Sequence, residues 1–260
     1  MITYAMNSDV ETIKNIWKTI FHDEDWYLND FFNTYFIEDQ SCLLWKSEGE
    51  IIAMLHMLPF QYQTSANEKL NVIYLYALAT LESCRGKGIM DALIKKAVSD
   101  DRSGKTVYML VAASDELIKY YEKRAFIRVQ SHNSRNNTER KNPFIHKMQE
   151  LMCDLDVNTL SVNQNTTLLD EIKKIQGQSG YHGFLYQSKD ILFYLRTLLH
   201  EKKPASNLDK AAIDQNALKE LQQDYLSRQA SLAFSMLRTQ DTVLLSEKGI
   251  VTSDLWMVPL

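Results

Sequence analysis

A short basic turn with two glycines is the stretch whose residue types point most directly to chemistry. Arg85-Gly86-Lys87-Gly88 stands between nine mostly apolar residues, 72–80, and a run whose apolar positions recur at helical spacing. The first amides of a helix have no partner within the helix and lie at the positive end of its dipole, so they bind phosphate oxygens well. The turn therefore predicts an anion site. A solvated turn between a core strand and a core helix would show the same spacing.

The elements on either side of the turn must hold it in position. Residues 72–80 are rich in β-branched and aromatic side chains, which is typical of a central strand buried on both faces. After the turn, one helical face collects Ile89, Met90, Leu93, Ile94, Ala97 and Val98. No Ser, Thr, Asp or Asn stands at the expected helix start near Gly88, so no side chain should compete for the first amides.

The turn resembles the Arg/Gln-x-x-Gly-x-Gly/Ala signature of the GCN5-related N-acetyltransferases (GNATs). The longer segment from Leu78 to Met90 is similar to the enhanced-intracellular-survival-like branch of that superfamily. The resemblance implies that acetyl-coenzyme A binds as cosubstrate, with its pyrophosphate on the turn, and that no metal takes part. It assigns cofactor binding to Leu78, Ala79, Thr80, Arg85, Gly86, Lys87, Gly88, Ile89 and Met90. Met90 departs from the general signature, which has Gly or Ala at that position.

The resemblance is strong over residues 1–129 and implies an α/β fold with a mixed sheet in the order β-α-α-β-β-β-α-β-α-β. The central strand and the strand after it are expected to splay apart. We assign residues 1–145 to a GNAT acetyltransferase domain and 146–260 to a C-terminal α/β domain. That second part is either a degenerate GNAT-like half or an extension for the acceptor site or oligomerisation. Helices are expected there at 168–175, 189–200 and 208–226, and residues 177–183 are expected to form a loop.

Catalytic roles also follow from the resemblance. Residues 121–126 are similar to the family's Tyr-Glu-Lys-x-Gly-Phe, with Ala125 in place of the glycine. The match implies that Tyr121 protonates the leaving thiolate, although Tyr120 or a purely structural role stays open. A backbone amide near residues 78–80 would stabilise the oxyanion. In this branch the C-terminal carboxylate can act as base, which points to Leu260.

Other candidates for the base also remain. Residues 72–80 contain neither a carboxylate nor a histidine. His56 has an ordinary pKa of about 6.5 and could accept a proton at neutral pH, but it is also consistent with a core histidine. The carboxylates of residues 21–32, or a water relay, are further alternatives.

Composition excludes several classes of protein. The net charge is −4 with a pI near 5.9, and neither half carries a dense Lys/Arg patch, so we expect no nucleic-acid or membrane partner. The three cysteines, Cys42, Cys84 and Cys153, have neither disulfide-framework nor metal-ligand spacing. No apolar run approaches about 18 residues and the N-terminus does not resemble a signal peptide, so a cytoplasmic location is expected.

The function predicted is transfer of an acetyl group from acetyl-coenzyme A to a primary amine. Residues 21–32 mix acids with aromatic side chains, and such a lid would favour a small cationic acceptor. The aromatics could equally be core residues and the acids merely solvated. A homo-oligomer is possible. The alternatives are an acyl-coenzyme A sensor without catalysis and a scaffold protein with a decayed cofactor site.

Overall fold

The computed structural model describes residues 1–64, 66–101, 106–128, 170, 173–179, 181, 183–201 and 234–238. These residues fall into two compact units. The first unit holds residues 1–61, 70–128 and 235–238. The second holds residues 62–64 and 66–69 together with the described residues between 170 and 201 and residue 234.

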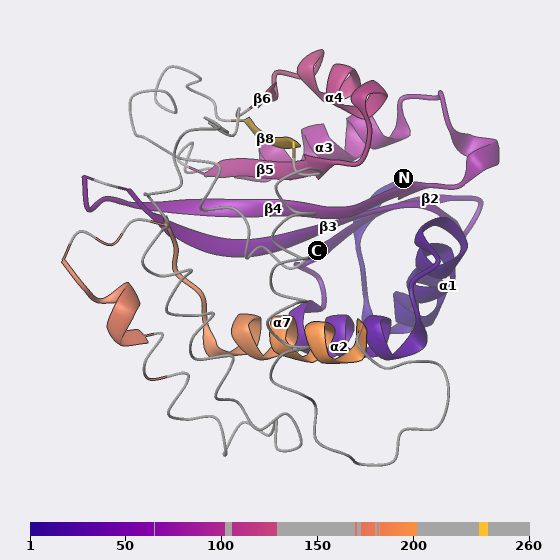
Figure 1. The fold of residues 1–260 in the computed structure, drawn as a ribbon. Coiled ribbons are helices and arrows are strands. Elements are labelled where there is room, and N and C mark those ends of the chain that lie inside the picture. The colour runs from indigo at the N-terminus through magenta and orange to yellow at the C-terminus, as the bar shows by residue number, and fades with distance from the viewer. Residues whose placement is uncertain are drawn as a thin grey trace, which may run out of the picture. The chain divides into compact units, whose positions relative to one another are not determined.

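The elements of the first part of the chain follow the predicted order. They are β1 (Ile2–Tyr4), α1 (Val10–Phe21), α2 (Asp25–Tyr35), β2 (Cys42–Ser47), β3 (Glu50–Gln63), β4 (Lys69–Thr80), α3 (Ile89–Asp100), β5 (Val107–Ala112), α4 (Asp115–Glu122) and β6 (Ile127–Arg128). Figure 1 shows α3 and α4 on one face of the sheet and α1 and α2 on the other. The predicted mixed-sheet α/β fold and its order β-α-α-β-β-β-α-β-α-β are therefore confirmed.

The sheet has the strand order β1-β2-β3-β4-β5-β8-β6, where β8 is Phe234–Arg238. β1, β2 and β3 pair antiparallel, β4 and β5 pair parallel, and β8 pairs antiparallel with β6. The β2–β3 hairpin turns at Glu48 and Gly49, whose φ angles are 52° and 86°. Two central residues with positive φ define the hairpin turn that matches strand twist, and the second of them is the glycine.

Strands β4 and β5 pair with each other over only part of the length of β4. β4 and β5 pair only from Val72 opposite Val107 to Tyr74 opposite Met109, after which β4 runs on to Thr80. Ala77, within the portion of β4 that has no partner in β5, has a φ of 47°, which an alanine in a strand rarely adopts. The two strands therefore splay apart beyond Tyr74, as the resemblance implies.

Burial explains why these segments form the elements that they do. The stripe predicted for α3 is confirmed in the core, where Ile89, Leu93, Ile94 and Ala97 pack with residues of β4, β5 and α4. In β4, Val72, Tyr74, Leu75 and Ala79 are buried, whereas the residues between them are only half-buried. The strand is thus less completely covered than its apolar sequence indicates.

The end of α4 carries strain that a single substitution should relieve. Ala125 occupies the left-handed conformation, with a φ of 62°, where the family pattern has glycine. A residue with a Cβ is destabilised by about 1–2 kcal/mol in this conformation. Glycine avoids that strain, but the greater conformational entropy of glycine in the unfolded chain offsets part of the gain. Ala125→Gly is therefore expected to raise the free energy of unfolding in urea by about 0.5–1 kcal/mol. Ala92→Gly, within helix α3, is the control and should lower it by about 1 kcal/mol. A loss of stability in both variants would contradict the assignment of strain to Ala125.

The second unit is described over fewer residues. The end of β3 pairs with β7 (Gly183–Phe184), and the rings of Tyr62 and Phe184 meet edge to face at 5.2 Å. Helix α7 (Ser188–Glu201) confirms the helix predicted at 189–200, and its Ile191, Leu192 and Phe193 are buried.

Several predictions fall wholly or partly outside the described residues. The helix expected at 208–226 is not described. Of the helix expected at 168–175, residues 170 and 173–175 are helical, and residue 176 extends the helix by one position. In the predicted loop, Gly177 lies in a turn and Gly183 lies in β7. No helix in the described part of the chain combines the length and apolarity that a membrane crossing requires.

Candidate active site

The glycines of the basic turn are required by backbone conformation. Gly86 and Gly88 have φ angles of 76° and 75°, a region that other residues enter only with strain. A Cβ built at either position would meet no atom within 4 Å. The space above both glycines is therefore open, so a ligand atom can approach this backbone closely.

The first amides of α3 remain available for a ligand. The helix ladder begins with the amide of Ala92, which donates to the carbonyl of Gly88 at 3.0 Å. The amides of Ile89, Met90 and Asp91 precede that bond and have no acceptor within the helix. Gly88 is the N-cap, and no side chain caps this end, as the sequence predicted. An anion bound here would meet donors at the positive end of the α3 dipole.

Arg85 is attached to the end of the central strand. Its Nε donates to the carbonyl oxygen of Thr80 at 3.1 Å, and its backbone amide donates to Glu82 at 3.2 Å. The guanidinium is exposed, so its remaining donors can reach a ligand. The strand thus determines where this positive charge stands beside the turn.

A cavity of about 630 Å³ opens over the turn. Its walls contain all of the predicted cofactor residues except Lys87, which is exposed on the turn. The structure therefore brings together most of the residues that the signature singled out. The wall residues are Ile20, Phe21, Leu78, Ala79, Thr80, Cys84, Arg85, Gly86, Gly88, Ile89, Met90, Leu117, Tyr120, Tyr121 and Arg124.

Some of these wall residues had no signal in the sequence. Ile20 and Phe21 end helix α1, about 60 residues before the turn. Arg124 occupies the variable position of the Tyr-Glu-Lys-x-Gly-Phe pattern, so the resemblance gives it no role. Cys84 and Leu117 are ordinary apolar positions. Only tertiary contact between separate elements identifies them.

Tyr121 lies at the wall with its hydroxyl uncommitted. The residue is 6% exposed, and its ring packs against Tyr120 and Phe126 with centroids at 5.2 and 5.7 Å. No hydrogen bond joins its hydroxyl to another described residue. Burial raises the pKa of the Tyr121 phenol well above its usual value, and Tyr120 adds to the shift. The hydroxyl therefore keeps its proton at neutral pH and can donate it.

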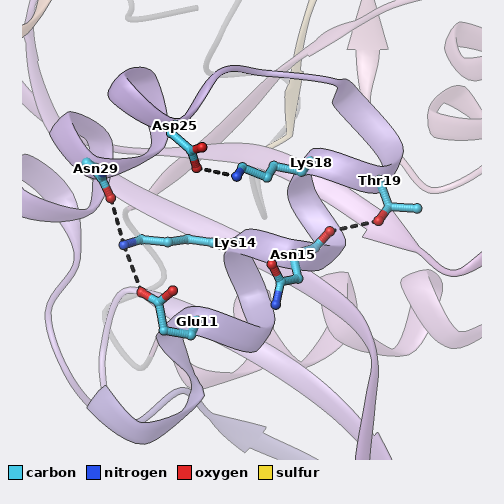
Figure 2. A network of polar contacts seen from close by, with 7 residues as sticks. All are labelled: Glu11, Lys14, Asn15, Lys18, Thr19, Asp25 and Asn29. Atoms are coloured by element: carbon cyan, nitrogen blue, oxygen red, sulfur yellow. Dashed lines mark hydrogen bonds and ion pairs between the residues drawn. The ribbon is translucent and has the colours of Figure 1, made fainter.

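Helix α2 is anchored firmly to α1. Figure 2 shows Lys14 of α1 donating to Asn29 of α2 at 2.9 Å, and Lys18 pairing with Asp25. On the inner side, the rings of Trp17 and Phe31 meet with centroids at 4.7 Å. The contacts on both sides hold α2 against α1, and no residue of α2 lines the cavity, so the helical part of the segment predicted as a lid does not cover it.

The aromatics of that segment are mostly core residues. Tyr27, Phe31 and Phe32 are buried, so the core interpretation of Phe31 and Phe32 is the correct one. The carboxylates between the helices have partners of their own. Asp23 accepts from the Trp17 indole and Glu24 from the Trp26 indole, each at 2.7 Å. Asp23 and Glu24 lie near the end of α1, and each already accepts one hydrogen bond from an indole.

His56 is a core histidine. It is 1% exposed on β3, among the rings of Trp17, Phe31 and Phe32, and it does not line the cavity. Its Nε2 lies 3.7 Å from the Cys42 sulfur, and its Nδ1 has no partner among the described residues. Burial lowers the pKa of the imidazole to about 3. A general base at this place would be cut off from the reacting amine.

The buried imidazole makes stability depend on pH. Below the unfolded-state pKa of about 6.5, the unfolded chain binds a proton at His56 that the folded chain does not accept until about pH 3. The free energy of unfolding is therefore expected to fall by about 2 kcal/mol from this group between pH 7 and pH 5. Urea unfolding at both pH values, on the parent and on His56→Phe, measures the difference. The same loss in both proteins would contradict a neutral buried His56.

Two remaining expectations are not decided by this geometry. Leu260, the predicted source of a C-terminal carboxylate, lies outside the described residues. Within the part of the chain that the structure describes, no group of three His, Cys, Asp or Glu side chains could hold a metal ion.

Comparisons with known proteins bear on the fold and on the first half of the chain. Residues 1–127 match the family model described as the acetyltransferase (GNAT) domain. The structure of Eis1 from Mycobacterium abscessus is 13% identical with a TM-score of 0.51, over 78% of this chain and 49% of that one. The fold is thus the GNAT fold. The part of the chain that matches the acetyltransferase family model, residues 1–127, includes the signature around Gly86 and Gly88.

Two further structures resemble about half of the chain. A probable N-acyltransferase from Enterococcus faecalis is 11% identical with a TM-score of 0.43, over 50% of this chain and 32% of that one. The GNAT family N-acetyltransferase YhbS from Escherichia coli, in complex with CoA, is 17% identical with a TM-score of 0.40, over 49% and 68%. This chain spans about a third of the Enterococcus protein and about half of Eis1. A comparison with curated protein sequences found no match.

Proposed function

We propose that this protein transfers an acetyl group from acetyl-coenzyme A to a primary amine of a small, cationic acceptor. The observation that carries the proposal is one cavity with complementary walls. On one side are the open amides of α3, and on another is the uncommitted hydroxyl of Tyr121.

The residues of the turn fit the phosphates of acetyl-coenzyme A. The amides of Ile89 and Met90 are open, the backbone at Gly86 and Gly88 leaves space for an oxygen, and Arg85 adds positive charge. The splayed strand beyond Tyr74 offers the backbone of Leu78, Ala79 and Thr80 to an extended arm. Bound acetyl-coenzyme A supplies the thioester that an amine attacks.

In this proposal, groups of the chain itself stabilise the negative charge that develops during the reaction and supply a proton to the leaving group. A backbone amide near Leu78 to Thr80, just beyond the irregular Ala77, stabilises the developing oxyanion. The amine nitrogen forms the new bond to the acyl carbon and loses a proton to a water relay or to the C-terminal carboxylate of Leu260. The carbon–sulfur bond breaks, and the Tyr121 hydroxyl donates its proton to the departing sulfur. The transfer from a phenol of pKa about 10 to a thiolate near 8.5 costs about 2 kcal/mol, and burial of Tyr121 raises that cost. A preorganised hydrogen bond must offset it.

The choice of a cationic acceptor rests on the end of α1. Phe21 lines the cavity and is 39% exposed, so its ring can take a cation on its face. Asp23, Glu24 and Asp25 follow directly in the chain. Their carboxylates give this junction a negative potential even though each has a partner, because Asp23 and Glu24 are bound by neutral indoles.

One observation favours a second candidate, an acyl-coenzyme A sensor without turnover. Met90 lines the cavity at a position where the signature has a small residue. A larger side chain there reduces the room for a reacting group but leaves the phosphate donors untouched. A sensor would therefore bind acetyl-coenzyme A and release no thiol.

Further parts of the proposal extend to the whole chain. We place it in the enhanced-intracellular-survival-like branch on the string from Leu78 to Met90. We keep the boundary between its domains near residue 145, with residues 146–260 shaping the acceptor site or an oligomer interface. A cytoplasmic location and the absence of nucleic-acid and membrane partners stay predictions from composition.

Turnover with a panel of amines tests the proposed function. The purified full chain is mixed with acetyl-coenzyme A and diamines, polyamines, aminoglycosides or peptides, and free thiol is followed over time. We expect thiol release that depends on a small cationic amine, with the acetylated amine detected by mass spectrometry. Neutral hydroxyl analogues of the best amine are the control. Binding of acetyl-coenzyme A without release for any amine would favour the sensor.

A further inference from the structure

The first turn of α3 contains a carboxylate, Asp91, beside the proposed anion site. Asp91 is the acidic residue of that turn, directly after Met90. A helix N-terminus stabilises a carboxylate for the same reason that it stabilises a bound phosphate. An uncompensated Asp91 would therefore repel the phosphates that the neighbouring amides attract.

Both oxygens of Asp91 are paired with cations. Arg124 Nε lies 2.9 Å from Oδ1, and Lys95 Nζ lies 2.8 Å from Oδ2. The two partners differ in exposure, since the Lys95 side chain is 70% exposed and the Arg124 side chain 23%. Water screens the charge of the exposed lysine more strongly, so Arg124 exerts the stronger charge attraction, whereas the stronger hydrogen bond to Asp91 comes from Lys95. Lys95 and Arg124 together hold the pKa of Asp91 below its usual range.

Arg124 is itself fixed by its own helix. Its Nη1 donates to the carbonyl oxygen of Tyr120 at 2.7 Å, and its Cζ lies 3.5 Å from the centroid of the Tyr120 ring. The guanidinium thus links the last turn of α4, which carries Tyr120 and Tyr121, to the first turn of α3. Arg124 also lines the cavity. Its hydrogen bond goes to Tyr120, and its Nε approaches Asp91 as an ion pair without hydrogen-bond geometry.

We infer that Asp91 and Arg124 form a charge-compensating clasp between α3 and α4. In this clasp Arg124 neutralises Asp91 beside the phosphate-binding amides and holds the Tyr120–Tyr121 pair at the cavity wall. Arg124 is a positioning residue that acts through Asp91 rather than a direct ligand of the phosphates. The inference rests on the proposed binding of acetyl-coenzyme A. It gives Arg124, which the family signature does not include, an effect on the affinity for that ligand.

A double-mutant cycle tests the clasp. Arg124→Gln, Asp91→Asn and the double variant are made in the full chain, and calorimetry measures the Kd for acetyl-coenzyme A. Arg124→Gln is expected to weaken binding about five- to tenfold, because Asp91 then repels the phosphates. Asp91→Asn is expected to bind at least as tightly as the parent. The double variant is expected to return to within about twofold of the parent, because it removes the charge that needed compensation.

Two further readouts separate charge from packing. The loss in Arg124→Gln is expected to shrink when salt rises from about 50 to about 300 mM, since screening weakens charge repulsion but not a packing defect. Lys95→Gln removes the more exposed partner of Asp91 and should change the Kd by less than about twofold. Thermal unfolding of every variant verifies that the fold is retained.

Distinct outcomes overturn the inference. If the double variant binds as weakly as Arg124→Gln, then Arg124 contacts the ligand directly. If Asp91→Asn is as weak as Arg124→Gln, the pair only supports the fold. The same proteins titrated with inorganic pyrophosphate distinguish this failure from failure of the proposed function. If the pattern of the double-mutant cycle appears with pyrophosphate but the parent transfers no acetyl group, the clasp is supported and the proposed enzymatic function is refuted. If the parent turns over but the cycle shows no such pattern, the enzymatic function is supported and the clasp is refuted.

Discussion

Replacing Tyr121 with phenylalanine is expected to lower kcat by about 10²-fold, because general acid catalysis typically contributes at least that factor. The phenyl ring keeps its packing against Tyr120 and Phe126, so only the hydroxyl is lost. That hydroxyl makes no hydrogen bond to a described residue, and its removal leaves no buried partner unsatisfied. Steady-state thiol release, with acetyl-coenzyme A and the best amine both varied, measures the effect.

The neighbouring tyrosine provides a matched control for this variant. Tyr120→Phe removes a hydroxyl from the same helix turn, while the aromatic ring stays under the Arg124 guanidinium. We expect it to change kcat less than about threefold, and both variants to keep the Kd for acetyl-coenzyme A within about twofold. Equal kcat losses in the two variants, or full activity in Tyr121→Phe, would remove Tyr121 from its proposed role as acid.

Removal of both positive charges from the turn is expected to weaken acetyl-coenzyme A binding at least tenfold, or about 1.4 kcal/mol. Arg85 is held at the end of β4 by the Thr80 carbonyl, and Lys87 stands exposed between the two glycines. Each of them can meet the pyrophosphate with a charge-assisted hydrogen bond. Calorimetric titration of Arg85→Ala combined with Lys87→Ala, beside the parent, measures the loss.

A second double variant controls for the change in net charge. Lys119 of α4 and Lys123, directly after the helix, are exposed and do not line the cavity. Their combined replacement by alanine removes the same charge as the turn variant, and we expect it to change the Kd less than about twofold. Similar losses in both double variants would show long-range attraction rather than a phosphate site at the turn.

The turn itself could be predicted from the sequence because its signals are local. The apolar strand before it, the helical stripe after it and the glycines at 86 and 88 all lie within 30 residues. The structure shows what the glycines provide, since both have positive φ. The unusual conformation of Ala125 was also indicated locally, by a pattern that has glycine there.

Properties that depend on tertiary contact could not be predicted. Periodicity placed His56 on a strand, but only the rings of Trp17 and Phe31 around it show that it is sealed from the cavity. The pairing of Asp91 with Arg124 joins residues 33 positions apart, and neither residue has a distinctive neighbour pattern. The acids after Phe21 could be recognised as a negative cluster, but their indole partners could not.

The prediction for the C-terminal part had less local support. Helix α7 was found from its apolar periodicity, which is strong over 189–200. Strand β8 was not expected, and its pairing with β6 adds residues 235–238 to the sheet of the first unit. A strand of five residues far from its partner in sequence has no helical or hairpin signal to reveal it.

Calorimetric titration of the untagged full chain with acetyl-coenzyme A tests whether the basic turn is a cofactor site. We expect one site per chain with a micromolar Kd, and binding at least tenfold weaker in the variant that combines Arg85→Ala with Lys87→Ala. No measurable binding by a parent protein that unfolds cooperatively on heating would contradict the claim. The turn would then be a solvated connection between strand and helix, and the fold would serve only as a scaffold.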